Sequence, residues 1–372
     1  MNQINRRNWL RLTGLAGSAA IVAPLKSNTI SQYVGDINSP VNGSARLSSN
    51  ENPFGPSQRV RDAIIKGFEE GCRYPFGKVR ELMDVLAKKE GVEPNQIIVT
   101  GGSTEGLKAT GLTYGVHGGE IISPDPTYLS LLSYAEQFGA YINRVPLNEK
   151  LEHDLDEMEK RVGNQTRLVF VCNPNNPTGT IIPKDKITDF CRSLSRRTLV
   201  FSDEAYGDFI VDKEYPSMID LVKEGANVIV SRTFSKVYGL AGLRVGYLIA
   251  RPDIAGRIRP NVMANTNMLA IYAALEALND QDFYRFSLDK NEEGKAYIYN
   301  VLDELGLEYV KSHTNFIFFH TGRPIQDLIS QMNGKGVNIG RPFPPLSDWC
   351  RISTGKMDDL HRFGEALKQV MA

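Results

Sequence analysis

The stretch Asn227-Val-Ile-Val-Ser-Arg-Thr-Phe-Ser-Lys236 joins an apolar, β-branched run to a lysine among small hydroxyl residues. It continues into Val237-Tyr-Gly-Leu-Ala-Gly-Leu-Arg-Val-Gly246, where Arg244 lies between glycines. The apolar run predicts a strand that ends in a polar turn. A lysine amine can form a Schiff base with an aldehyde, and hydroxyls with an arginine can hold a phosphate. Pyridoxal 5'-phosphate (PLP) carries both groups, which makes it the first candidate ligand.

Apolar runs and amphipathic segments alternate through the middle of the chain. This alternation is typical of a mostly parallel sheet sandwiched by helices. Strands are expected over 97–99, 120–123, 141–145, 168–172, 198–202, 228–231 and 246–250. Helices are expected over 58–71, 79–90, 107–114, 125–138 and 184–195.

Polar clusters follow four of these strands, at 101–104, 173–176, 203–206 and 231–236. In open α/β sheets, ligands gather at the carboxyl ends of the strands. The shared position of the clusters therefore predicts one binding site more strongly than any single motif does.

The pattern changes after about residue 261. Long amphipathic helices are expected over 269–278, 282–305, 325–335 and 356–371, with strands over 308–310, 316–319 and 349–354. We therefore expect an α/β domain over 76–260 that binds the cofactor and a smaller α+β domain over 261–372, with the segment 28–75 joining the smaller one.

Residues 1–27 differ from the rest of the chain. The segment Asn5-Arg-Arg-Asn-Trp-Leu-Arg11 lacks acidic residues and precedes a short run of apolar and small residues. This order is typical of an export signal, and the paired arginines resemble a twin-arginine signal. The apolar run is too short to span a bilayer comfortably, so we expect no stable membrane insertion after leader removal. The expected location is the periplasm or an equivalent exported compartment; without export it is the cytoplasm.

Net charge and cysteine spacing give no reason to expect nucleic acid or a metal ion as a partner. Lysine plus arginine number 43 and aspartate plus glutamate also number 43, so a net charge of zero gives no reason to expect nucleic acid. The cysteines match no zinc or CxxC spacing, and no metal site is predicted. They are Cys72, Cys172, Cys191 and Cys350.

Several motifs together resemble the fold-type I PLP enzymes, the class I/II aminotransferases, and most closely their histidinol-phosphate aminotransferase branch. The resemblance covers roughly everything after Leu47, and the leader lies outside it. The motifs are Ser49-Asn-Glu-Asn-Pro-Phe-Gly55, Tyr74-Pro75, Gly101-Gly-Ser-Thr104, Pro126-Thr-Tyr128, Asn173-Pro-Asn-Asn-Pro-Thr-Gly179, Asp203-Glu-Ala-Tyr206, Ser235-Lys236, Gly239-Leu-Ala-Gly-Leu-Arg-Val-Gly246 and Arg351-Ile-Ser353.

The resemblance implies three catalytic residues, Lys236, Asp203 and Tyr206. Lys236 forms the Schiff base and then moves a proton as the base, and Asp203 keeps the pyridine nitrogen protonated. Tyr206 and Asn176 form hydrogen bonds with the ring oxygen of the cofactor.

The resemblance also implies how PLP is held. Tyr128 stacks on the ring. The phosphate is bound by Ser103, Thr104, Thr233, Ser235 and Arg244, joined by Tyr74 of a neighbouring subunit, which implies a homodimer.

The substrate residues are implied in the same way. Arg351 binds the α-carboxylate through a bidentate fork, with Asn52 and Asn315 assisting. The segment 341–345 is expected to set specificity. Its Arg341 either meets an acidic or phosphorylated side chain or is a solvated loop residue.

The predicted function is transfer of an amino group from an L-amino acid (histidinol phosphate, aromatic or similar) to a 2-oxo acid such as 2-oxoglutarate. One alternative is a PLP-dependent decarboxylase of the threonine-phosphate type, because the same residues serve that reaction. Another is an exported PLP-binding protein without catalysis. The donor stays open, and the leader counts against histidinol phosphate because a biosynthetic histidine enzyme has no evident reason to be exported.

Overall fold

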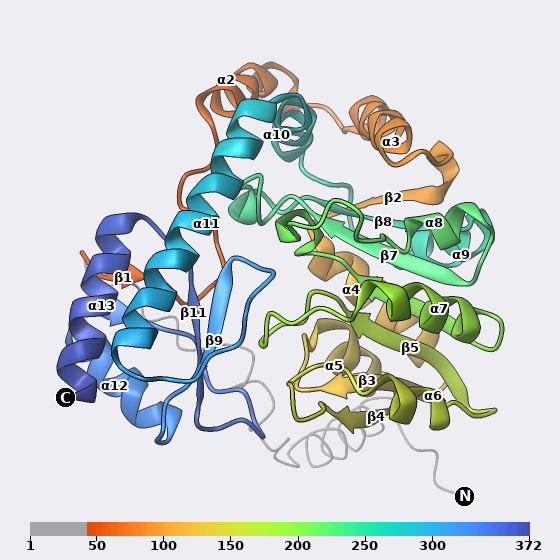
Figure 1. The fold of residues 1–372 in the computed structure, drawn as a ribbon. Coiled ribbons are helices and arrows are strands. Elements are labelled where there is room, and N and C mark those ends of the chain that lie inside the picture. The colour runs from red at the N-terminus through yellow and green to blue at the C-terminus, as the bar shows by residue number, and fades with distance from the viewer. Residues whose placement is uncertain (1–42) are drawn as a thin grey trace, which may run out of the picture. The chain divides into compact units, whose positions relative to one another are not determined.

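The computed structural model describes residues 43–372, and its central feature is a seven-stranded sheet (Figure 1). Neighbouring strands are parallel, except that β8 runs antiparallel to both of its neighbours. In spatial order the strands are β2 (Ile97–Thr100), β8 (Gly246–Ala250), β7 (Val228–Thr233), β6 (Leu199–Asp203), β5 (Thr166–Cys172), β3 (Glu120–Asp125) and β4 (Tyr141–Pro146).

The expected mostly parallel sheet is confirmed, and the exception has a local cause. No crossover α-helix separates β7 from β8; the connection holds only the short 3₁₀ turn Ala241–Leu243. A chain without a crossover turns back beside the strand it has just left, so β8 pairs antiparallel to β7.

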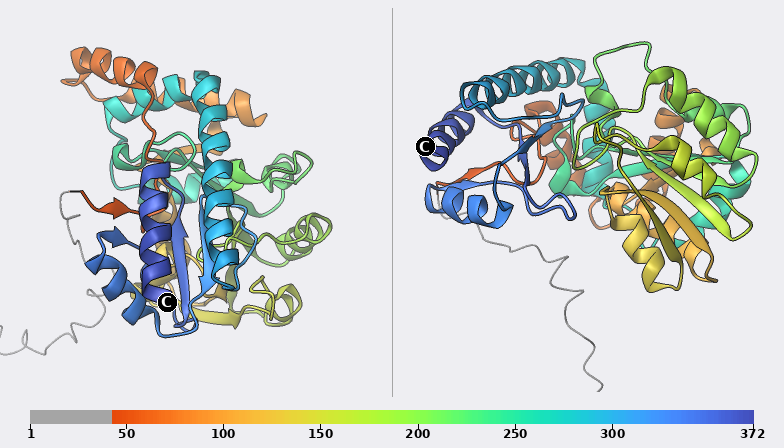
Figure 2. Two further views of the ribbon diagram at one scale, coloured as in Figure 1. Left: turned by 60° about the vertical axis from the view of Figure 1, so that its left-hand side comes forward. Right: turned by 60° about the horizontal axis from the view of Figure 1, so that its bottom comes forward.

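Helices cover both faces of this sheet (Figures 1 and 2). One face packs against α4 (Ser103–Gly115), α5 (Ser130–Gln137) and α9 (Pro252–Ile258). The other packs against α6 (Leu155–Lys160), α7 (Lys184–Ser195) and α8 (Ile219–Lys223). The central strands are apolar on both sides for this reason: Val200 points into one core and Phe201 into the other.

Three further helices lie together at one end of the sheet, at the top of Figure 1. They are α2 (Gln58–Gly67), α3 (Phe76–Glu90) and α10 (Met268–Asn279). Gly67 permits the close approach of α10, because a Cβ there would lie 2.9 Å from the Tyr272 ring. The buried face of α10 joins the same core as α3 and α7.

A separate core forms around the C-terminal elements. The 24-residue helix α11 (Gln281–Glu304) leads into it, and α12 (Ile325–Gly334) and α13 (Met357–Met371) close it. Strand β9 (Phe316–His320) pairs antiparallel with β11 (Trp349–Ser353). Strand β1 (Ala45–Arg46) pairs parallel with β10 (Val337–Asn338), so the start of the described chain lies in this core.

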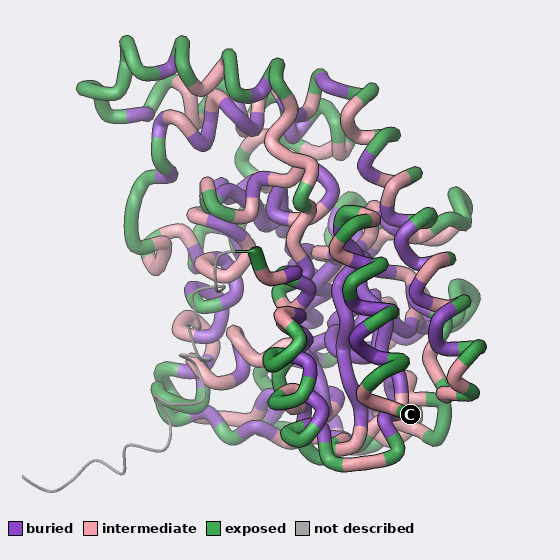
Figure 3. Tube along the Cα trace, turned by 90° about the vertical axis from the view of Figure 1, so that its left-hand side faces the viewer, coloured by how far each residue is buried: buried purple, intermediate pink, exposed green. Residues whose placement is uncertain are grey.

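The burial pattern follows these two sets of elements, with the strands mostly buried and the outer helix faces exposed (Figure 3). Within residues 43–372, no helix has the length and apolarity that crossing a bilayer requires. The predicted leader lies outside the described residues, and the predicted domain limits stay predictions.

Some elements differ from the expectation. Helix α4 begins at Ser103 rather than 107, because Gly102 (φ 84°) ends the turn and polar residues fill the first helical turn without an apolar signal. Helix α5 begins at Ser130 rather than 125, since strand β3 extends to Asp125. The expected strand 308–310 is a single bridge from Tyr309 to Phe319.

Candidate active site

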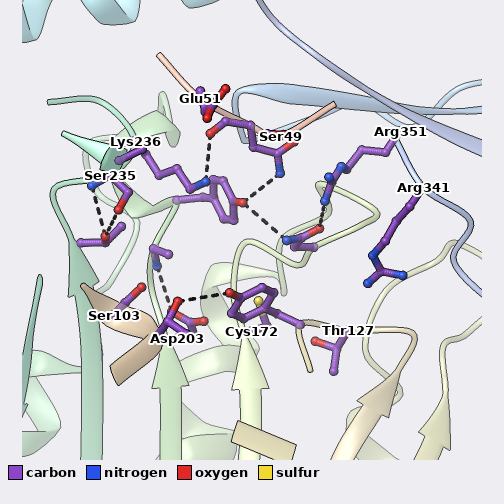
Figure 4. Close-up of a pocket in the computed structure, with 18 of the residues that line it drawn as sticks. Ser49, Glu51, Ser103, Thr127, Cys172, Asp203, Ser235, Lys236, Arg341 and Arg351 are labelled. Atoms are coloured by element: carbon purple, nitrogen blue, oxygen red, sulfur yellow. Dashed lines mark hydrogen bonds between the residues drawn. The ribbon is translucent and has the colours of Figure 1, made fainter. Parts of the chain in front are cut away.

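A cavity of about 390 Å³ lies at the carboxyl ends of the parallel strands (Figure 4). It brings together most of the predicted site residues, from the ends of β2, β3, β5, β6 and β7 and from β11. Those lining it are Ser103, Thr104, Tyr128, Asn176, Asp203, Tyr206, Thr233, Ser235, Lys236, Arg244 and Arg351.

One corner of the cavity is built to hold an anion. Arg244 Nη1 lies 3.5 Å from Ser235 Oγ and donates to Ala241 O at 2.8 Å. Its guanidinium lies against Gly102, where a Cβ would be 2.2 Å from Nη2. Gly102 immediately precedes the first turn of α4, whose free N–H groups favour negative charge. Hydroxyls of Thr233 and Ser235 complete the corner, 3.0 Å apart.

Lys236 projects into the centre of the cavity (Figure 4). Its Nζ donates to the main-chain oxygen of Asn50 at 2.9 Å and lies 5.3 Å from the centre of the Tyr206 ring. Burial lowers the pKa of Lys236 to about 8, and the positive charge of Arg351 acts in the same direction. The amine is therefore far more often neutral, and nucleophilic, than an exposed lysine.

Asp203 ends strand β6 at the floor of the cavity. It is 2% exposed, and burial raises the pKa of its carboxyl to about 7. Its Oδ1 accepts a bond from Ala205 N at 3.3 Å, and it forms no ion pair with any residue of the described chain. A buried carboxylate of this kind is stabilised by a ligand that brings a cationic N–H.

Four polar side chains form a connected wall. Tyr206 Oη accepts from Asn50 Nδ2 at 3.0 Å and from Asn176 Nδ2 at 3.5 Å. Arg351 Nη1 donates to Asn176 Oδ1 at 2.7 Å and Nη2 to Ser48 O at 2.8 Å. Burial lowers the pKa of Arg351 to about 10, so it is still a cation at neutral pH.

Arg351 and Arg341 lie on the same side of the cavity (Figure 4), and both guanidinium groups lie over the ring of Phe343. The guanidinium carbons lie 4.8 Å and 4.4 Å from the Phe343 ring centre, respectively. Arg341 thus lines the cavity while remaining exposed to solvent, and two cations border the ligand space.

Three predicted residues lie elsewhere. Asn52 donates to Val237 O at 2.8 Å and Ser287 Oγ at 2.9 Å, and it lines a small neighbouring cavity. Asn315 lines that same cavity. Tyr74 is 79% exposed and is absent from the lining of its own chain's site.

Sequence reasoning also missed residues that line the cavity. Asn50 is the most connected of these, and Thr127, Cys172 and Glu51 are others. Asn50 and Asn52 both belong to the motif Ser49–Gly55. The motif therefore identified the loop, but it did not show that Asn50 rather than Asn52 faces the cavity. The positive φ of Asn50, 53°, turns the chain there, and no local pattern reports it.

The chain matches the model for the family described as aminotransferase class I and II over residues 44–367. The chain belongs to this family. Histidinol-phosphate aminotransferase from Moorella thermoacetica is 39% identical over 331 residues, covering 88% of this chain and 85% of that protein. The predicted class of enzyme, a PLP-dependent aminotransferase, is confirmed.

Solved structures of family members have the same fold. The crystal structure of histidinol-phosphate aminotransferase from Sinorhizobium meliloti in complex with pyridoxal-5'-phosphate superposes with a TM-score of 0.82 at 28% identity, covering 88% of this chain and 90% of that one. A structure from Erwinia carotovora atroseptica, assigned to the same enzyme, gives a TM-score of 0.85 at 31% identity, covering 88% and 96%. The predicted fold-type I architecture is confirmed.

The decarboxylase alternative has weaker support. L-threonine-O-3-phosphate decarboxylase from Porphyromonas gingivalis superposes with a TM-score of 0.75 at 22% identity, covering 87% of this chain and 98% of that one. Similarity at that level shows a shared fold alone.

Proposed function

We propose that this aminotransferase takes the amino group of a donor with an anionic group near its amine, histidinol phosphate among the candidates, and passes it to a 2-oxo acid. The observation that carries the proposal is the single cavity in which a lysine of lowered pKa faces a buried carboxylate, an anion corner and two arginines.

The residues of the cavity fit PLP by the chemistry of their donors. The anion corner at Arg244 takes the phosphate, and Asp203, a carboxylate without an ion-pair partner in the described chain, takes the protonated ring nitrogen. When bound, PLP supplies an aldehyde carbon that bonds amines and a ring that withdraws electrons from the donor's Cα.

The chain's own groups then have defined tasks. Lys236 Nζ would hold the cofactor at its aldehyde carbon and, once the donor's amine takes its place there, would carry a proton between the donor's Cα and that carbon of the cofactor. Asp203 would keep the ring nitrogen protonated, and Tyr206 and Asn176 would hydrogen-bond the ring oxygen. Arg351 binds the anionic group of donor or acceptor and orients it.

We also propose that Tyr74 serves the phosphate corner of a second copy in a homodimer. Its side chain is 79% exposed and stacks on the exposed ring of Phe76, 5.7 Å between centres. A tyrosine that is outside its own site but available at the surface fits a role in a partner's site.

Export by the twin-arginine route is proposed from residues 1–27, which precede the described residues. That route carries folded proteins, so the cofactor would be acquired before export. Fractionation of expressing cells tests this: recovery of the unprocessed chain in the cytoplasm alone would contradict it.

The function is tested with the purified holoenzyme and a panel of amino donors that includes histidinol phosphate and aromatic amino acids. A true donor should bleach the long-wavelength absorption of the bound cofactor, and a 2-oxo acid should restore it. Lys236→Ala should abolish the bonded form of the cofactor. No spectral change with any donor, or release of carbon dioxide, would contradict the proposal.

A further inference from the structure

Asn50 connects two residues of the cavity, Tyr206 and Lys236, with Ser353 of β11, and all three come from distant parts of the chain. Its Nδ2 donates to Tyr206 Oη at 3.0 Å, and its main-chain oxygen accepts from Lys236 Nζ at 2.9 Å. Ser353 Oγ lies 2.8 Å from the main-chain N and 3.0 Å from Oδ1. Asn50 is 2% exposed, so these bonds do not compete with solvent.

The identity of residue 50 meets two requirements at once. Its φ of 53° lies in the left-handed region, which asparagine and glycine adopt more readily than other residues. Of the two, only asparagine also supplies an amide donor. Glycine at this position would keep the backbone path but lose the bond to Tyr206.

The direction of each hydrogen bond is fixed by the main chain. The N–H of Asn50 must donate, so Ser353 Oγ accepts it and turns its own proton toward Oδ1. The amide oxygen is therefore occupied, and the NH₂ group faces Tyr206. Tyr206 Oη accepts that bond and a longer one from Asn176, which leaves its own proton for a third partner.

We infer that Asn50 is a positioning residue that aims the Tyr206 hydroxyl proton into the cavity, toward the ring oxygen of the cofactor, and that Ser353 fixes the Asn50 amide for this task. The inference rests on the proposed function, in which Tyr206 bonds that oxygen. Arg351 and Ser353 are two residues apart on β11 and share one face of the strand, so one strand places both the arginine proposed to bind the substrate anion and the residue that supports Asn50.

A hydrogen-bond donor aimed at the ring oxygen stabilises the negative charge of that oxygen, so the bound cofactor loses its proton at a lower pH. Removing this hydrogen bond therefore raises the pH at which the cofactor titrates. Other ionisable groups act on Tyr206 and keep their side chains when residue 50 is substituted: Arg351, Cys172, Tyr128 and Lys236. Asp203 lines the same cavity and is also retained.

The test is a pH titration of the cofactor absorption in the holoenzyme, together with the dissociation constant of PLP. Asn50→Gly should raise the midpoint by about 0.5–1 pH unit, the size expected for one hydrogen bond. Tyr206→Phe should raise it as well, and the double variant should go no further than Tyr206→Phe alone. A purely structural role would instead leave the midpoint unchanged or give additive shifts, and either result overturns the inference.

Two further variants keep the test decisive. Ser353→Ala should shift the midpoint in the same direction by less, and should have no effect in the Asn50→Gly background. Asn50→Asp keeps the shape and the backbone conformation but replaces the donor by an acceptor, so it should raise the midpoint at least as far as Asn50→Gly. If the wild-type protein lacks the absorption band of the bound cofactor, the proposed function fails. If the wild-type protein shows the band and Asn50→Gly and Asn50→Asp have the same titration midpoint as wild type, only the inference fails.

Discussion

Folding buries the carboxyl group of Asp203 in surroundings that disfavour its charged form. Buried at the end of β6, it has its pKa raised from 3.8 to about 7, chiefly because burial disfavours the charged form. A carboxyl group whose pKa is higher in the folded than in the unfolded protein destabilises the fold as the pH rises above the unfolded pKa. The destabilisation reaches its full size once the pH exceeds the folded pKa. The charged form of Asp203 therefore destabilises the cofactor-free protein, and a ligand with a cationic N–H would relieve this destabilisation.

Asp203→Asn should separate these two effects. Above about pH 7 the cofactor-free variant should melt at a higher temperature than wild type, and the difference should vanish as the pH falls toward about 4. With cofactor, kcat should fall roughly 10²- to 10⁴-fold, since an amide cannot hold the ring proton as a carboxylate does. Calorimetry of both forms and steady-state kinetics measure this, and a lower melting temperature above pH 7 would contradict it.

At the scale of elements, the turn between β2 and α4 fixes the anion corner. Gly102 has φ 84° and ψ 159°, a backbone conformation adopted almost only by glycine. The same residue leaves room for Arg244, whose own φ is 59°. Gly246 of β8 presses against this turn, with its Cβ position 2.6 Å from Ser103 N. Two glycines on separate elements therefore bring a helix N-terminus and a guanidinium together.

Gly102→Ala should lose affinity for PLP by at least tenfold, because the new Cβ meets the Arg244 guanidinium at 2.2 Å. Backbone strain should add about 1–3 kcal/mol of destabilisation. Equilibrium dialysis and thermal melting measure the two effects. Gly256→Ala, a change on α9 where an added Cβ meets nothing within 4 Å, is the matched control: it should leave PLP affinity unchanged and, because alanine favours the helix, should not lower the melting temperature. Unchanged PLP affinity in Gly102→Ala would contradict the assignment of the corner.

At the scale of the whole molecule, the open question is whether one chain completes its own site. Mixed dimers of Tyr74→Ala and Lys236→Ala chains answer it. If Tyr74 serves the partner, each mixed dimer has one intact site, and random assembly should restore about a quarter of wild-type activity at limiting cofactor. If activity stays at the sum of the two parent variants, Tyr74 acts within its own chain or not at all.

Much of the architecture could be predicted because it is encoded locally. The apolar runs at β5, β6 and β7 and the polar turns after them are contiguous in sequence, and burial of both sheet faces explains their composition. Helix α7 lies over Lys184–Ser195, where the sequence pattern predicted it. The short strands β1 and β10 could not be predicted, because two residues each carry no periodicity.

The sequence by itself determined the chemistry of this protein: an amine, a carboxylate and an anion corner at the ends of strands, as the family pattern requires. Only the tertiary structure decided which side chains meet. It turned Asn50 rather than Asn52 into the cavity, and it placed Arg341 beside Arg351 across the Phe343 ring. Local patterns report which face of an element is apolar, whereas contacts across 150 to 300 residues depend on how whole elements pack and on single backbone turns such as the one at Asn50.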